Sequence, residues 1–225
     1  MSETMMTIRP DSYTTDRSTA GTVTFSNIPN MLDSDRDTYG SISTTLTVAS
    51  TTYVLSRGTV NLYFDFSRIP TGATVSRANV VIRANSTIPA SVTGYSFVDK
   101  EAYIHVLDDT SAIKGGSIDT STTSSIAFPL SDLQIASFIN SANPNVRIRA
   151  SLRGKKTSTK YNNKTFTLTA NVYDVGLEIY YTLPTSGKVK VNGAWVDAEP
   201  KVKVNGAWVE PDSIFVKANG SWEEI

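Results

Sequence analysis

Short runs in which apolar and polar residues alternate fill the chain from Thr22 to Leu183, and this alternation constrains the fold more than any other feature. Examples are "SISTTLTV", "TVNLYFDF" and "FTLTANVYDVGLEIYYTL". A period of two residues turns one side of a β-strand toward a core and the other toward solvent. No long helical pattern separates the runs, so the sequence predicts an all-β sandwich of packed sheets.

The composition suits such sheets and excludes some partners. Of the 225 residues, 27 are Ser and 29 are Thr, and Thr is favoured on a pleated, half-exposed surface. The 21 basic and 21 acidic residues balance, so there is no net field to attract nucleic acid or an anionic membrane, and we expect neither as a partner. The chain has no Cys, which excludes disulfides and thiolate metal sites.

One segment carries a helix signal. In "PLSDLQIASFIN", Ser131 stands where an N-cap is needed, and "SANPN" ends the pattern. We expect Leu133, Ala136 and Phe138 to share one side of this helix.

The chain divides into three predicted parts. Residues 1–20 are polar and lack periodicity, so we expect an N-terminal arm that is ordered only against a partner. Residues 21–184 form the sandwich, and a Pro, Ser and Gly cluster separates it from a C-terminal unit at 188–225. The start does not resemble a secretory signal, and no stretch reaches the roughly 18 apolar residues of a membrane span. This predicts a protein made in a cytoplasm that leaves it by lysis, as part of a particle.

The C-terminal unit repeats one phrase three times: "VKVNGAW" at 189–195 and 202–208, and "VKANGSW" at 216–222. Asn-Gly between alternating residues is the strongest short signal for a two-residue hairpin turn. Each copy is therefore predicted to be one β-hairpin with its Val residues on one face. On the other face a Lys lies opposite a Trp in three pairs: Lys190 with Trp195, Lys203 with Trp208, and Lys217 with Trp222.

Three roles are open for these Lys and Trp residues. The rings either hold the hairpins together, through contact with the Lys stems and a cation–π interaction of about 0.5–1 kcal/mol, or form exposed platforms on which sugars stack, or anchor a subunit interface. An isolated hairpin is marginal in water, so the Val faces must cover something.

Two stretches resemble families of virion proteins. "VKVNGAWV" resembles the short Trp hairpin repeats near the ends of bacteriophage tail proteins, where the turn is often Gly-Gly. "DSDRDTYGSIS" followed by "VNLYFDFSRIPTGATVSRANVVIRA" resembles a jelly-roll module of phage tail and other virion proteins. The resemblance implies a virion component with a jelly-roll-like β-sandwich followed by three short β-hairpin repeats, and it transfers no catalytic residue. The residues that carry the jelly-roll match are Phe64, Asp65, Phe66, Ile69, Pro70, Gly72 and Ala73.

A candidate metal site lies in "LDSDRDTYG", where Asp33, Asp35 and Asp37 alternate like the start of an oxygen-ligand Ca²⁺ loop. Jelly-roll modules of the kind this chain resembles often carry such a structural ion. Arg36 and the lack of a later Glu depart from the full pattern. A polar loop with Asx turns is the alternative.

No pattern marks a catalytic site, and we expect that the protein is not an enzyme. His105 is the only histidine, and its apolar neighbours in "EAYIHVL" predict a half-buried strand residue. Ser–His catalysis would also need a carboxylate beside it. Glu101 and Glu178 are the only glutamates between the predicted arm and the repeats, and no motif pairs them for glycoside cleavage.

A basic loop, "RGKKTSTKYNNK" at 153–164, holds five basic residues and no acid. It is predicted to connect two strands of the sandwich. It is either a solvated loop or an electrostatic contact to an acidic subunit or an anionic wall polymer such as teichoic acid.

The two resemblances imply a bacteriophage virion protein, in the tail or associated with it, and we expect it to bind other virion proteins and to contact a host cell-wall glycan. A capsid-decorating or head-fibre protein is the close alternative, and a carbohydrate-binding module of a bacterial enzyme is an alternative of a different class. We expect a homo-oligomer, a trimer or a higher ring, because closed homo-oligomers are the usual solution for surfaces that seek partners.

Overall fold

The computed structural model describes residues 3–33, 35, 37–107, 112–118 and 122–183, and the backbone of six short strands between 187 and 224. Residues 3–183, here called the body, form two antiparallel sheets packed face to face. The predicted all-β, jelly-roll-like sandwich followed by three hairpins is therefore confirmed.

Sheet A has six strands and sheet B has five. Five strands of sheet A follow the order β3 (Thr22–Ser26), β4 (Gly40–Val48), β11 (Lys164–Thr182), β6 (Thr74–Thr87) and β9 (Ser124–Leu130). The sixth, β1 (Thr4–Ile8), pairs with the C-terminal part of β11, beyond the part of β11 that pairs with β4. Sheet B follows the order β2 (Pro10–Thr19), β5 (Val54–Phe64), β10 (Asn145–Lys156), β7 (Tyr95–Leu107) and β8 (Ala112–Ser117).

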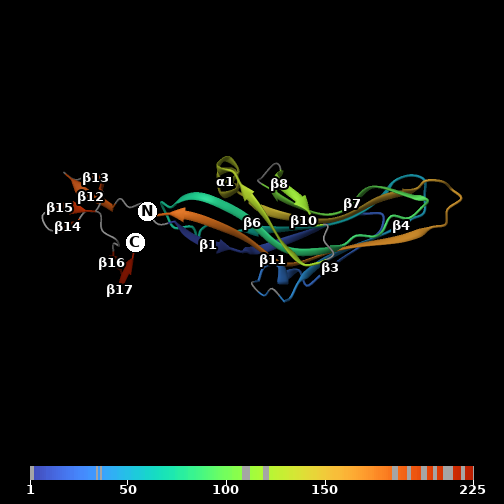
Figure 1. The fold of residues 1–225 in the computed structure, drawn as a ribbon, viewed down its shortest axis with the longest axis horizontal. Helices are drawn as coiled ribbons and strands as arrows, with labels where there is room; N and C mark the ends of the chain where they lie inside the picture. Colours follow the sequence, from blue (N-terminus) through green and yellow to red (C-terminus); the bar gives the residue numbers. More distant parts are fainter. Residues whose placement is uncertain are drawn as a thin grey trace.

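The body is elongated along its strands, as Figure 1 shows. Strand β11 is 19 residues long and runs from one end to the other. At one end, the tip, Lys164 pairs with Val48 in sheet A, and the corresponding end of sheet B pairs Lys156 with Tyr95. At the other end, the base, Thr4 of β1 pairs with Tyr181 of β11.

The core follows from the alternation of the strands. Ile148 and Leu152 of β10 face Leu46 and Leu168 of sheet A across the sandwich, and all four side chains are fully buried. Burying such side chains contributes roughly 1.5–3 kcal/mol each, so this layer is the main source of stability.

Hydroxyl side chains cover the outer surface of sheet A. Three cross-strand pairs between β4 and β11 join their hydroxyl groups over 2.9–3.0 Å: Ser43 with Thr169, Thr45 with Thr167, and Thr47 with Thr165. Such cross-strand pairs stabilise a sheet by roughly 0.2–1 kcal/mol each. This ladder uses Thr on the pleated outer surface, as the composition predicts.

The segment that resembles a virion module connects β5 to β6. The Asp65 carboxylate accepts a hydrogen bond from the Ser67 amide over 2.8 Å, and Gly72 has a φ of 82°, which favours glycine. The rings of Phe64 and Phe66 lie 5.9 and 5.6 Å from the ring of Phe138 on the helix. The predicted strand, turn and second strand are confirmed, and the turn packs beneath the helix.

The predicted helix is α1 (Asp132–Ile139), with Ser131 at its N-cap. The Ser131 amide donates to Oε1 of Gln134 over 2.9 Å, as in a capping box. The buried residues are Ile135 and Phe138, whereas Leu133 is 85% exposed. The predicted placement of Leu133 and Ala136 beside Phe138 is wrong. An α-helix has 3.6 residues per turn, so residues five apart, such as Leu133 and Phe138, lie on different sides of the helix.

The prediction of an arm at residues 1–20 is also wrong, because Thr4–Ile8 and Pro10–Thr19 are strands of the two sheets. Ile8 is buried, but nearly every side chain of β2 is exposed. Main-chain hydrogen bonds to β5 hold β2 as an edge strand, so its sequence carries little apolar alternation for a pattern to detect.

Each repeat forms a separate two-stranded antiparallel sheet, shown in orange and red in Figure 1. The pairs are β12 (Gly187–Val191) with β13 (Ala194–Ala198), β14 (Val202–Val204) with β15 (Ala207–Val209), and β16 (Phe215–Ala218) with β17 (Ser221–Glu224). The predicted register is confirmed: Lys190 is opposite Trp195, Lys203 opposite Trp208, and Lys217 opposite Trp222. The Asn-Gly turns lie outside the described residues.

Candidate functional site

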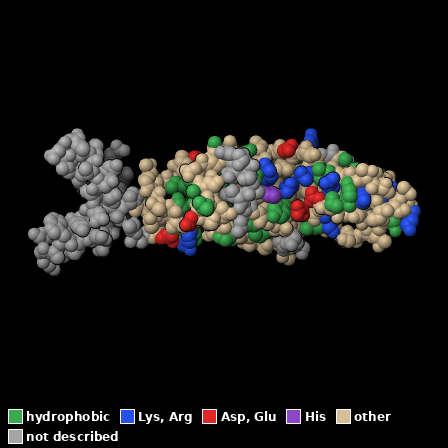
Figure 2. Space-filling model, turned by 90° about the horizontal axis from the view of Figure 1, so that it is seen from above, with side chains coloured by type: hydrophobic (Ala, Val, Ile, Leu, Met, Phe, Trp, Pro, Cys, Tyr) green, Lys and Arg blue, Asp and Glu red, His purple; other side chains and the backbone are tan. Residues whose placement is uncertain are grey.

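The outward side of sheet B carries a concentration of charged and aromatic residues. Because Ile104 and Ile148 point into the core, the residues on either side of them along β7 and β10 point outward. Figure 2 shows this surface, with Lys and Arg side chains gathered near the histidine and acidic side chains beside them. The β7–β10 face is defined as Asp99, Glu101, Tyr103, His105, Asn145, Arg147, Arg149, Ser151 and Arg153, with Arg57, Asn61 and Tyr63 of β5 beside them.

His105 lies opposite Arg147 on this face. Nη2 of Arg149 is 2.8 Å from Nε2 of His105. A guanidinium can only donate, so Nε2 accepts and the imidazole is neutral with its proton on Nδ1. Burial, with the positive charges of Arg149 and Arg147, lowers the pKa of His105 below its ordinary value of 6.5. The predicted half-buried strand position of His105 is confirmed, and Arg149 occupies the nitrogen that a general base would use.

Two of the three arginines of β10, Arg147 and Arg149, have no acidic partner in the described part of the chain. Nε of Arg147 donates to Oδ1 of Asn61 over 2.9 Å, and Asn61 in turn donates to Thr14 over 3.3 Å. Arg149 contacts His105 instead. Both guanidinium groups are therefore held in place by neutral groups, and their charges are not neutralised by a neighbouring carboxylate within the described residues.

Three buried side-chain atoms have no hydrogen-bond partner among the described residues, and all three belong to the β7–β10 face: Nε of Arg149, Oδ1 of Asp99 and Oδ1 of Asn145. The other oxygen of Asp99 is well bound, since it accepts from Ser151 over 2.6 Å and pairs with Arg57 at 3.5 Å. Buried polar atoms without a partner are uncommon in folded proteins, and each calls for an explanation. One donor and two acceptors remain to be satisfied here.

The tip of the body is basic and aromatic. The ring of Tyr53 lies 4.6 Å from Nζ of Lys155 and 5.7 Å from the guanidinium of Arg153, within the range of a cation–π interaction. The basic loop connects β10 to β11, as predicted, and Figure 2 shows Lys and Arg side chains at that end of the body. Tyr161 belongs to this loop, and its ring packs on Gly94, which precedes β7 and has a φ of 94°.

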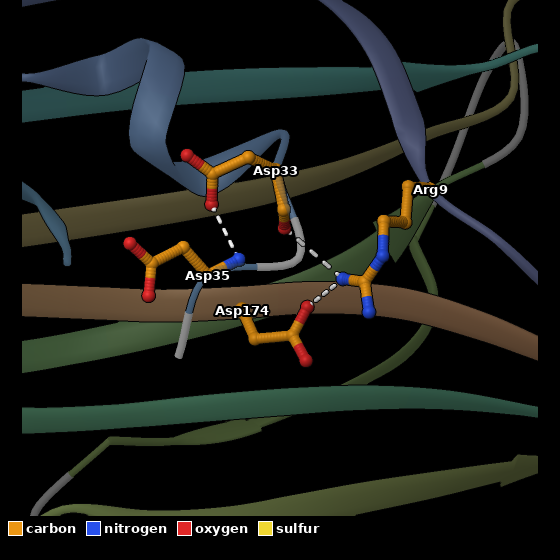
Figure 3. Close-up of polar contacts among 4 residues, drawn as sticks. All are labelled: Arg9, Asp33, Asp35 and Asp174. Atoms are coloured by element: carbon orange, nitrogen blue, oxygen red, sulfur yellow. Dashed lines mark hydrogen bonds and ion pairs between the residues drawn. The ribbon is translucent and has the colours of Figure 1, made fainter. Parts of the chain in front are cut away.

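The aspartate loop is built from local turns, as Figure 3 shows in part. Oδ1 of Asp33 accepts from the Asp35 amide over 3.0 Å, and Oδ1 of Asp35 accepts from the Asp37 amide over 2.9 Å. Arg9 donates to the backbone carbonyl oxygen of Asp33 over 3.1 Å and forms an ion pair with Asp174. In the described residues no three metal-binding side chains lie where they could hold an ion. These hydrogen bonds are those of Asx turns, as the alternative predicted, and a Ca²⁺ site at Asp33, Asp35 and Asp37 stays a prediction.

The other residues singled out in the sequence are separated or undescribed. Glu101 lies on sheet B and Glu178 on sheet A, so they do not form a carboxylate pair across one site. The side chains of Trp195, Trp208, Trp222, Lys190, Lys203 and Lys217 lie outside the described part of the structure, and their roles stay predictions.

Sequence reasoning missed Arg147 and Arg149 of β10. The signal lay in "VRIRASL", where these two residues alternate with buried apolar residues. Such spacing places both arginines on the outward side of the strand.

Comparisons with known proteins place the chain near few others. No family model matches it, and no curated protein matches it. Among solved structures it is similar to TmCBM61, determined in complex with beta-1,4-galactotriose, with a TM-score of 0.32, 8% identity, and coverage of 75% of this chain and 89% of that one. It is also similar to a chain of infectious bursal disease virus, Gx strain, with a TM-score of 0.20, 11% identity, and coverage of 80% of this chain and 32% of the viral one. The pairing of the strands therefore establishes the fold, without these likenesses.

Among the described residues, no helix is long and apolar enough to cross a membrane.

Proposed function

We propose that this chain is a non-catalytic component of a bacteriophage particle, in the tail or associated with it. It assembles with other virion proteins or copies of itself through the C-terminal hairpins, and it contacts a host surface with the tip of its body.

The observation that carries this proposal is that each of the three hairpins pairs only with itself among the described strands. A two-stranded hairpin is at best marginally stable in water. Three in succession therefore call for a covering surface, and a neighbouring copy or another virion protein supplies one. The likeness of the repeats to the ends of phage tail proteins agrees with this role.

The arrangement of the body supports the second half of the proposal. The chain enters at Thr4 and leaves β11 at Thr182, and both positions belong to the base. If the hairpins that follow bind the particle, the basic tip is the part that faces away. Lys155, Lys160 and the rings of Tyr53 and Tyr161 then meet an anionic wall polymer such as teichoic acid first.

Two measurements test the assembly role. Mass spectrometry and imaging of purified particles should detect the protein at the tail, and sedimentation of the full chain should give a trimer or a larger ring. A monomer in solution that is also missing from the particles would contradict the proposal. Placement on the head instead would favour a capsid-decorating or head-fibre protein.

A charge reversal tests the tip. Lys155→Glu combined with Lys160→Glu should weaken binding to purified cell walls, and more so at low salt, because surface charges are screened as ionic strength rises. Arg68→Glu combined with Arg77→Glu reverses two exposed positive charges away from the tip and is the matched control. Equal loss in both variants would show that overall charge, rather than the tip, decides binding.

A further inference from the structure

We infer that β2 is an interface at which two copies of this chain pair edge to edge, antiparallel, around a two-fold axis at Thr14. The pairing extends sheet B of one copy into sheet B of the other. It uses neither the hairpins nor the tip, and it does not depend on a role in a phage particle.

The outer edge of β2 is open in the described part of the chain. The strand lies at the end of the order of sheet B and pairs only with β5 among the described strands. The side chains of residues 11–18 are all exposed, so no described segment covers them. An edge of ten residues is long for one left open, because unpaired main-chain groups are a template for a further strand.

The usual protections of an edge strand are scarce in β2. The strand has no Lys, and its one Pro is the first residue. Its register irregularity is confined to the stretch between Pro10 and Ser12, and from Ser12 to Thr19 it pairs continuously with β5. Proteins commonly block an edge with Lys, with Pro or with a bulge that twists it away, so most of this edge stays suited to pairing.

Main-chain geometry limits the registers in which two copies of β2 can pair. Alternate residues turn their main-chain groups to the same side, so a two-fold axis must lie at one residue, which then faces its own copy. With the axis at Thr14, Asp11 of each copy lies opposite Arg17 of the other, and Tyr13 lies opposite Thr15. Opposite charges and aromatic–β-branched pairs both stabilise antiparallel sheets.

The charges that this register brings together are free to pair. Asp11 and Arg17 form no ion pair with another described residue, and both side chains are exposed. Asp11 lies at the irregularity of the strand and has no partner residue in β5. A second copy can therefore reach and neutralise both charges without breaking a contact of the first.

Other axes lose this match. An axis at Asp16 or at Arg17 would place that residue opposite its own copy, with like charges in contact. An axis at Tyr13 would place Arg17 opposite Arg9, and an axis at Thr15 would bring no opposite charges together. The sequence of β2 therefore favours one register over its neighbours, as an edge that pairs with itself requires.

Disulfide trapping tests the register, because the chain contains no Cys and one introduced thiol can react only with its own copy. Directly opposite residues in antiparallel strands have Cα atoms about 4.5–5.5 Å apart, a separation that a disulfide spans. Mild oxidation of the full chain carrying Thr14→Cys should give a covalent dimer in non-reducing denaturing electrophoresis. Ser18→Cys is the matched control: it is exposed on the same strand, but it would lie about 26 Å from its own copy and should stay monomeric.

A charge swap tests the two ion pairs. In the Thr14→Cys protein, Arg17→Asp should slow disulfide formation by about tenfold, because it places like charges opposite each other at two positions. Adding Asp11→Arg restores opposite charges in the reverse sense, and the rate should return to that of Thr14→Cys alone.

A mixture of Ser12→Cys and Asp16→Cys proteins gives an independent reading, since these residues face each other in the same register. The mixed disulfide should exceed either homodimer, and thermal melting shows that each variant is folded. Equal cross-linking of Thr14→Cys and Ser18→Cys, or no excess of the mixed disulfide, would overturn the inference and leave the edge to a strand of another protein. Neither result alters the particle and wall-binding experiments, so the two proposals fail separately.

Discussion

Arg149 donates a hydrogen bond from Nη2 to Nε2 of His105 over 2.8 Å, and this contact links the stability of sheet B to the protonation of one imidazole. A protonated His105 would place a third positive charge beside Arg147 and Arg149, and would have no lone pair to accept the bond. The folded protein therefore favours the neutral ring.

Stability should consequently fall as the pH is lowered through about 6.5, the ordinary pKa of histidine. Below that pH the unfolded chain binds a proton at His105, while the folded chain, in which this pKa is lowered, stays neutral. The unfolded state then holds more protons, so the free energy of unfolding rises with pH in this window. Above it neither state binds the proton, and this contribution to the slope vanishes.

Urea unfolding between about pH 5.5 and 7.5 measures this slope. The variant His105→Gln should flatten it. Glu3 and Asp65 also have lowered pKa values, through hydrogen bonds from Ser76 and Ser67 respectively, but their stabilisation is lost at lower pH. A slope that persists in the variant would show that another group titrates here.

The ion pair between Arg9 and Asp174 should matter more to stability than the pair between Arg77 and Glu3. The side chains of the first pair are 26% and 11% exposed, and those of the second are 60% and 37% exposed. Arg9→Ala should lower the free energy of unfolding by about 1–3 kcal/mol, and Arg77→Ala by no more than about 1 kcal/mol. Chemical unfolding of both variants checks the order, and equal losses would contradict it.

Gly94→Ala should destabilise the tip. The φ of 94° is unfavourable for any residue with a Cβ, and an added Cβ would lie 2.5 Å from the ring of Tyr161. We expect a loss of at least about 1 kcal/mol. Gly176→Ala is the control, because its φ is not positive and its Cβ would meet a single methyl group of Thr7 at 3.1 Å. Hydrogen exchange should locate the effect of Gly94→Ala in the loop around Tyr161.

A chelator should leave the melting temperature unchanged. The carboxylates of Asp33 and Asp35 already accept hydrogen bonds from backbone amides. A bound ion that stabilised the folded state would raise the melting temperature as its concentration increased. Thermal scans with EDTA and with excess Ca²⁺ should therefore coincide, and a rise with Ca²⁺ would restore the metal-site prediction.

In the repeats, Val204→Asp should disrupt assembly far more than Lys203→Ala. If the Val faces are covered, the aspartate places a charge on a buried surface, whereas removal of the Lys203 side chain opposite Trp208 costs about 0.2–1 kcal/mol. Sedimentation of both variants measures the effect. Trp208→Ala separates the other roles: lost wall binding with intact assembly indicates sugar stacking, and release from the particle indicates an interface anchor.

The parts of the fold that sequence reasoning captured are those in which local chemistry fixes the conformation. Two residues between paired strands set the Lys203–Trp208 register, and Ser131 marks the start of α1. The strand at Pro10–Thr19 was missed because main-chain bonding to β5 holds it, and its side chains show no apolar alternation. The β7–β10 face was missed because His105 and Arg149 become neighbours only through the pairing of β7 with β10, which spacing along the chain does not reveal.

The placement of both ends of the body, Thr4 and Thr182, at the base has a mechanical consequence. Thr4 lies opposite Tyr181, so a force applied between the start of the chain and the hairpins peels β1 from β11 one hydrogen bond at a time. A force applied between the tip and the hairpins instead pulls β11 along its 19-residue length, and its ladders to β4 and β6 are loaded in shear together. The body should therefore resist traction at its tip much better than traction at its N-terminus.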